Sequence, residues 1–182
     1  MSKPHAKILS RRVIYTGKVF SVRQDVVVEP GDIEATRDVV VHHGSVVLLP
    51  ILRDGRLVLV RQYRHSAGDF LLEVVAGRME PGESPLTAAR RELAEETGYR
   101  AKRFVKMMNV FPTPGFVSER MIAFTATGLT PGPTNPDADE RIENRPFPLK
   151  TLVSMIHKGD IHDMKTVACV LYYARFLAPH RA

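Results

Sequence analysis

Four glutamates within a 14-residue stretch are the side chains with the clearest chemical potential in this sequence: Glu83, Glu92, Glu95 and Glu96. Glu92 and Glu96 are four residues apart, so a helix would place them in one row. Like charges at this spacing repel each other and cost an isolated helix about 0.2–0.5 kcal/mol per pair. A divalent cation would offset that repulsion, and Mg²⁺ usually takes one or two protein carboxylates together with water and substrate phosphates.

A glycine-rich turn precedes these glutamates. Gly77 and Gly82 have the glycine spacing of a phosphate-binding P-loop, but Glu83 and Ser84 stand where that motif has Lys and then Ser or Thr. A carboxylate at this position repels phosphate, so we expect any phosphate to be held through metal ions. An ordinary cluster of glutamates is a solvated acidic helix face, and the charges alone leave this alternative open.

The glutamates are predicted to lie on a helix with clear end signals. Ser84 suits the N-cap, Pro85 the first helical position and Gly98 the residue just past the end, which predicts a helix from Pro85 to Thr97. Its apolar stripe consists of Leu86, Ala89 and Leu93. We therefore expect the stripe to face a core, with Glu92 and Glu96 beside it.

Strands and turns surround this helix. Before it we expect a strand meander over residues 12–41, a buried hairpin from Ser45–Leu52 and Arg56–Gln62, and a strand from Phe70 to Val75. After it we expect strands over Phe104–Phe111 and Met121–Ala126, loops at 112–116 and 130–139, and helices near Leu149–His157 and Asp163–Leu177. The meander would bury little surface alone, so it is predicted to dock on the main domain or on a second copy, which favours a homodimer. The predicted domains are 1–43, a dimerisation subdomain, and 44–182.

Composition limits the class of protein. A chain of 182 residues with 44% hydrophobic and 25% charged residues predicts one well-cored globular domain with a small appendage. The single cysteine, Cys169, lies in an apolar run and is expected to be a buried thiol in a reducing cytoplasm. No apolar run has the length of a membrane span. The net charge of +6 is spread in ones and twos, which argues against nucleic-acid binding.

The spacing of the glycine and glutamate residues matches a known signature. It runs Gly77, five residues, Glu83, seven residues, Arg91-Glu92-Leu93, one residue, Glu95-Glu96, one residue, Gly98. This pattern resembles the box of the Nudix hydrolase family at every fixed position, and only the last, usually aliphatic position differs, as Tyr99. Pro114, the segment 61–64 and the N-terminal meander further resemble the ADP-ribose pyrophosphatase branch.

This resemblance implies an α+β fold, the Nudix α/β/α sandwich of mixed sheets, with an N-terminal antiparallel meander exchanged between the subunits of a homodimer. It also implies a metal site for Mg²⁺, with Mn²⁺ as a possible substitute. The implied ligands are the backbone carbonyl of Ala76 and the side chains of Glu92, Glu95 and Glu96.

The remaining roles also follow from the resemblance. Glu83 would steady Arg91, which is counted with the catalytic residues Glu92 and Glu96. Glu140 would be the catalytic base. The implied substrate contacts are Arg64, Glu73, Gly115 and Glu119. Considered alone, Glu73 is an acid inside an apolar strand, and an exposed strand face is the alternative explanation.

The predicted function is Mg²⁺-dependent hydrolysis of ADP-ribose to AMP and ribose 5-phosphate by a cytoplasmic enzyme without a nucleic-acid or membrane partner. The alternatives are another nucleoside diphosphate sugar, such as GDP-mannose, ADP-glucose or a UDP-sugar, and a non-catalytic nucleotide sensor. The intact set of glutamates with Arg91 argues against a sensor, because a binding module would not need all of them.

Overall fold

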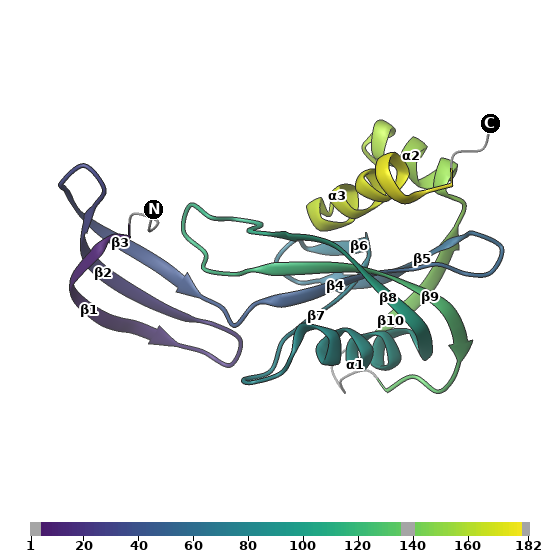
Figure 1. Cartoon of the computed structure of the whole chain (residues 1–182), viewed down its shortest axis with the longest axis horizontal. Helices are drawn as coiled ribbons and strands as arrows, with labels where there is room; N and C mark the ends of the chain where they lie inside the picture. The colour runs from purple at the N-terminus through teal and green to yellow at the C-terminus, as the bar shows by residue number, and fades with distance from the viewer. Residues whose placement is uncertain (1–4, 136–140, 180–182) are drawn as a thin grey trace. The chain divides into compact units, whose positions relative to one another are not determined.

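A computed structural model describes residues 5–135 and 141–179 of the chain. It divides into two compact units, Met1–Gly44 with Phe111–Arg120, and Ser45–Val110 with Met121–Ala182 (Figure 1). None of the helices in the described ranges is both long and apolar enough to cross a membrane.

The first unit contains the antiparallel meander that the sequence predicts. Its strands are β1 (Lys7–Thr16), β2 (Ser21–Glu29) and β3 (Ile33–Val41), in the order β1-β2-β3. Asp25 of β2 accepts two hydrogen bonds from Arg11 of β1, at 2.7 and 2.8 Å, which helps fix the pairing of these strands. Every residue of β1 is exposed. The large apolar side chains exposed on this unit include Ile8, Leu9, Val13, Ile14, Tyr15 and Ile33.

The segment Phe111–Arg120 belongs to the same unit. Its backbone pairs with β3, because Val40 N–H donates to Phe116 O at 2.8 Å and Ser118 N–H donates to Val40 O at 2.9 Å. The Arg120 guanidinium lies 4.7 Å from the centre of the Phe111 ring and joins the two ends of the segment. The segment is therefore a shaped loop, as its proline and glycine content predicts.

The described residues of the second unit form two sheets and three α-helices. Its strands are β4 (Ser45–Pro50), β5 (Leu57–Arg64), β6 (Asp69–Glu73), β7 (Val75–Arg78), β8 (Tyr99–Val110), β9 (Met121–Pro131) and β10 (Ile142–Phe147). The helices are α1 (Pro85–Thr97), α2 (Leu149–Lys158) and α3 (Met164–Tyr172), and a π-helical turn, η1 (Tyr173–Leu177), ends the described chain. The sheet orders are β7-β4-β9-β8 and β10-β5-β6, and β4 pairs in parallel with β9.

Helices cover both sides of these sheets, with α1 on one side and α2 and α3 on the other (Figure 1). Successive side chains of β4 point to opposite faces of its sheet, which explains why helices pack on both sides. Val46 and Leu48 pack in the cluster that contains Ala88, Ala89 and Leu93 of α1. Val47 and Leu49 pack in the cluster that contains Leu152 of α2 and Cys169 of α3. The prediction of an α/β/α sandwich of mixed sheets is confirmed.

Some local predictions are wrong. The expected pairing of 45–52 with 56–62 along a hairpin does not form, because β4 and β5 belong to different sheets. The two segments meet near the turn, at the isolated bridge Ile51↔Leu57 and at the hydrogen bond from Leu52 N–H to Arg56 O at 2.9 Å. Apolar runs that are buried on both faces fit either arrangement. Strand β8 begins at Tyr99 instead of Phe104, and β9 ends at Pro131 instead of Ala126. Both are longer than predicted because the two strands pair from Tyr99↔Pro131 onwards. Strand β10 was not predicted, and the second C-terminal helix ends in a π-helical turn.

Burial decides the remaining core assignments. Cys169 is fully buried in the cluster shared by α2 and α3, and burial raises the pKa of its thiol to about 12, as expected of a structural cysteine. In the predicted stripe of α1, Ala89 and Leu93 are fully buried, but Leu86 is 38% exposed. Leu86 lies in the first turn of the helix, so the stripe contributes to the core only from the second turn onwards.

These two leucines give a matched test of the packing of α1. Leu93→Ala should lower the free energy of unfolding by about 2–5 kcal/mol, because it leaves a cavity in a closed cluster. Leu86→Ala should lower it by less than about 1 kcal/mol, since the side chain already contacts water. Equilibrium urea unfolding measures both values, and equal losses would contradict this assignment of the helix faces.

Candidate active site

Helix α1 presents the glutamates of the box, and its ends lie where the sequence predicts. The Ser84 hydroxyl accepts a hydrogen bond from Thr87 N–H at 3.2 Å, and Gly98 ends the helix with φ 72°. A side chain on Gly98 would bring a Cβ within 2.4 Å of Gly132 O, so this position needs glycine for both its conformation and its close contact. The fixed ends set which helical turn faces the neighbouring strand β7.

Arg91 organises the charges around the box. Its Nε and one terminal nitrogen donate to both carboxylate oxygens of Glu83, at 3.1 and 3.0 Å. Its other terminal nitrogen donates to Glu92 Oε1 at 2.7 Å and to Glu95 Oε2 at 3.0 Å. These bonds raise the pKa of Arg91 and lower the pKa of Glu83. Glu83 therefore contacts Arg91 as the resemblance implies.

The same guanidinium also closes the turn between β7 and α1. Arg91 donates to the carbonyl of Arg78 at 2.9 Å, and Glu80 N–H donates to the Glu83 carboxylate at 3.0 Å. Arg91 thus links the last residue of β7 to the helix, while Glu83 holds the turn between them. The cluster fixes the distance between the strand and the glutamates on α1.

Gly77 lets the Glu92 carboxylate reach the backbone of β7. A Cβ on Gly77 would lie 1.8 Å from Glu92 Cδ and 2.1 Å from each carboxylate oxygen. The side chain of Glu92 therefore occupies the space that any other residue at position 77 would fill. Ala76 and Gly77 pair with Val47 and Val46 of β4, which anchors this backbone in the sheet.

Glu92 and Glu96 are both buried, with 9% and 7% of their surface exposed. A buried carboxylate is costly unless a positive charge or hydrogen-bond donors surround it. Arg91 contributes one positive charge against the carboxylates of Glu83, Glu92 and Glu95, so this group keeps a net negative charge. This buried i, i+4 pair, with Glu92 against the backbone of β7, fits a divalent cation with oxygen ligands.

Side chains alone do not form a complete ligand set. Within residues 5–135 and 141–179, no three His, Cys, Asp or Glu side chains are grouped so that they could hold a metal ion. The two buried carboxylates of Glu92 and Glu96 could supply part of a coordination shell that water and substrate phosphates complete. Mg²⁺ is typically bound in this way, so the residues present fit the predicted ion.

Arg64 and Glu73, two of the predicted substrate contacts, bind each other. Arg64 Nε donates to Glu73 Oε1 at 2.7 Å and its terminal nitrogen donates to Oε2 at 2.9 Å. Lys165 of α3 also binds Glu73 Oε2. Glu73 is 1% exposed, and although burial raises its pKa, these two cations outweigh burial and leave the pKa below its ordinary value. An exposed strand face is therefore not the explanation for this acid.

The other predicted site residues lie elsewhere in the chain. Gly115 and Glu119 belong to the first unit, in the loop that pairs with β3. Glu119 lies 3.9 Å from His42 Nδ1, which also accepts a hydrogen bond from Gly44 N–H at 3.0 Å. Glu140, the predicted base, lies outside the described residues. The roles of these residues stay predictions.

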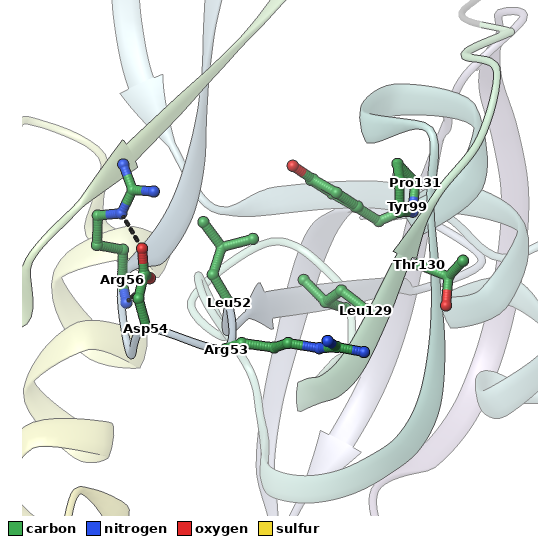
Figure 2. Close-up of a pocket in the computed structure, with 8 residues that line it drawn as sticks. All are labelled: Leu52, Arg53, Asp54, Arg56, Tyr99, Leu129, Thr130 and Pro131. Carbon is green, nitrogen blue, oxygen red and sulfur yellow. Dashed lines mark hydrogen bonds and ion pairs between the residues drawn. The ribbon is translucent and has the colours of Figure 1, made fainter.

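A shallow pocket of about 580 Å³ was not predicted from the sequence (Figure 2). Its lining comes from the turn after β4, the start of β8 and the end of β9: Leu52, Arg53, Asp54, Arg56, Tyr99, Leu129, Thr130 and Pro131. Tyr99, the last residue of the box, is the one box residue in this set. The buried glutamates are absent from the lining, so this pocket is distinct from the candidate metal site.

Comparison with known proteins identifies the family. The model of the NUDIX domain matches residues 41–168, which include the whole box and both sheets of the second unit up to α3. The chain belongs to the Nudix family. It is a Nudix pyrophosphohydrolase, and enzymes of this family generally need a divalent metal.

Relatives of known name are similar to this chain over most of its length. The ADP-ribose pyrophosphatase of Bacillus subtilis (strain 168) is 30% identical over 174 residues, 94% of each chain. The methanol dehydrogenase activator of Bacillus methanolicus is 32% identical over 168 residues, 91% of each chain. The GDP-mannose pyrophosphatase of Yersinia pestis (strain Pestoides F) is 32% identical over 140 residues, 71% of this chain and 70% of its own.

A solved structure agrees with the fold. The crystal structure of an ADP compounds hydrolase superposes with a TM-score of 0.82 at 23% identity, covering 97% of this chain and 96% of that one. The N-terminal meander lies within this match, so the likeness includes the part of the chain that precedes the Nudix domain.

The close approach at Gly77 gives a test of the site geometry. Gly77→Ala should reduce kcat/KM about 10- to 100-fold, because the new methyl group displaces the Glu92 carboxylate. The protein should stay folded, since the displaced atoms are the end of a flexible side chain. Steady-state kinetics and circular dichroism measure the two effects.

A double variant separates a local effect from a general one. If Gly77→Ala acts through Glu92, combining it with Glu92→Gln should cost little more than the more harmful single change, because both remove one interaction. If the loss of kcat/KM in the double variant equals the product of the two single losses, Gly77 acts independently of Glu92.

Proposed function

We propose that this protein hydrolyses the diphosphate linkage of ADP-ribose to AMP and ribose 5-phosphate in a Mg²⁺-dependent reaction. The observation that carries the chemistry is the buried pair Glu92 and Glu96, of which Glu92 lies against the backbone of Gly77. The choice of ADP-ribose is supported by the ADP-ribose pyrophosphatase relative, which aligns over 94% of both chains, whereas the GDP-mannose pyrophosphatase relative aligns over 71% of this one.

The metal would be held by Glu92, Glu96 and the carbonyl of Ala76, with Glu95 close by. When bound, Mg²⁺ neutralises diphosphate oxygens and lowers the pKa of a coordinated water. Arg91 orients the Glu92 carboxylate by its 2.7 Å hydrogen bond. The pairing of Ala76 with Val47 of β4 holds this backbone in the sheet and would orient its carbonyl.

Substrate positioning and proton transfer would come from residues outside the box. Arg64 would bind the anionic substrate, and its side chain is 35% exposed, so a ligand can reach it. Gly115 and Glu119 would line the substrate in the loop of residues 111–120. Glu140 would accept the proton of the attacking water, since an ordinary glutamate side chain has a pKa of about 4.3 and is ionised at neutral pH.

A homodimer and a cytoplasmic location complete the proposal. The large apolar side chains on the outside of the meander support a dimer, because a three-stranded sheet with apolar residues such as Val13 and Ile33 exposed is suited to a protein partner. A second copy that exchanges these strands would bury them.

The domain boundary also remains a prediction, with residues 1–43 assigned to dimerisation and residues 44–182 to hydrolysis.

The nearest alternative is another nucleoside diphosphate sugar, favoured by the GDP-mannose pyrophosphatase relative. Incubation with Mg²⁺ and a panel of ADP-ribose, NADH, ADP-glucose, GDP-mannose and UDP-glucose, followed by product analysis, decides between them. ADP-ribose should be cleaved fastest and should yield AMP. Faster cleavage of another sugar would keep the chemistry and overturn the substrate.

The same assay tests the metal assignment. Glu96→Gln should lower turnover of the best substrate at least about a hundredfold, because a metal contributes several kcal/mol of charge stabilisation. Glutamine has nearly the same size and helix propensity, so the melting temperature should stay close to that of the wild type. Wild-type turnover in this variant would contradict the role of Glu96 as a metal ligand.

A further inference from the structure

The N-terminus of α3 binds the buried acid Glu73, although the two segments are distant in sequence. Lys165 Nζ donates to Glu73 Oε2, on the carboxylate that also accepts two hydrogen bonds from Arg64. Neither the Nudix box nor the predicted site includes Lys165. Glu73 of β6, Arg64 of β5 and Lys165 of α3 therefore form one network of ion pairs.

Lys165 is held in place by the cap of its own helix. Asp163 is the N-cap of α3, where it accepts a hydrogen bond from Thr166 N–H at 3.0 Å and one from Lys165 Nζ at 2.8 Å. Thr166 is fully buried, and its hydroxyl oxygen accepts a hydrogen bond from Val74 N–H at 2.7 Å. The start of α3 is thus fixed to the residue that follows Glu73.

The charges of this network balance. Glu73 and Asp163 contribute two negative charges, and Arg64 and Lys165 two positive charges. Removing one partner of a buried pair leaves its counter-ion uncompensated, which is costly. Without Lys165, Glu73 would depend on Arg64 for its counter-charge. The network would then carry a net negative charge beside the partly exposed guanidinium of Arg64.

We infer that Lys165 is a positioning residue that acts through Glu73 to set the orientation of Arg64 and the net charge around it for the anionic substrate. The inference rests on the proposed function only in taking Arg64 as a substrate contact. Because Lys165 also binds the Glu73 carboxylate, Arg64 is not the only counter-ion of Glu73. The N-cap Asp163 and the hydroxyl of Thr166 give Lys165 the fixed position that this role requires.

The test compares Lys165→Met with Lys165→Arg, and uses Lys158→Met as a matched control. Lys158 is an exposed lysine in the last turn of α2. Lys165→Met should raise KM about three- to a hundredfold, the range that interaction energies within one salt-bridge network span, with kcat within about twofold of the wild type. Lys165→Arg should restore most of the affinity, and Lys158→Met should change neither constant.

A second measurement does not need turnover. The NMR signal of the Arg64 side-chain Nε–H, assigned by its loss in Arg64→Lys, should shift in Lys165→Met and return towards its wild-type position in Lys165→Arg. If Lys165→Met does not fold, Lys165→Gln replaces it, because glutamine keeps a donor without the charge.

The outcomes distinguish this inference from the proposed function. Unchanged KM in Lys165→Met, or a loss of kcat alone with a lower melting temperature, would show that Lys165 only stabilises the fold. If the wild type cleaves no nucleoside diphosphate sugar, the proposed function fails and the NMR comparison decides the link to Arg64. An Arg64 signal that does not move in Lys165→Met would overturn the inference.

Discussion

The interaction on which the site depends is the contact of one guanidinium with three carboxylates. Arg91 binds Glu83, Glu92 and Glu95 and also the carbonyl that ends β7, so it joins strand, turn and helix at one point. Buried carboxylates repel each other, and without Arg91 this part of α1 would favour water over the sheet. The cluster keeps enough negative charge for a divalent cation while it holds the glutamates in place.

The two apolar clusters support this arrangement from both sides of the sheets. On one side Leu93 and Ala89 bury the inner face of α1 against Val46 and Leu48, which leaves Glu92 and Glu96 at the edge of that contact. On the other side the cluster of α2 and α3 fixes the start of α3, from which Lys165 reaches Glu73. The glutamates of α1 and the ion pair of Lys165 with Glu73 are therefore each supported by a neighbouring apolar cluster.

Local signals in the sequence predicted α1 and its glutamates well, because Ser84, Pro85 and Gly98 act within a few residues of the ends that they define. The resemblance to the Nudix box implied that Glu83 would steady Arg91, and the two side chains are in contact. Pairing between distant segments was less predictable. The hairpin prediction was wrong because a strand buried on both faces carries no alternation to show which sheet it joins. The contact of Lys165 with Glu73 joins residues 92 positions apart and leaves no pattern in one sequence.

Direct metal binding tests the central claim, that the buried glutamates of α1 hold a divalent cation. Titration of the protein with Mn²⁺, followed by electron paramagnetic resonance of the free ion, measures the affinity without a substrate. Wild-type protein should bind the ion, and Glu92→Gln should weaken binding about 10- to 100-fold, while the exposed Glu34→Gln should bind like the wild type. Equal Mn²⁺ affinity in all three proteins would contradict the account.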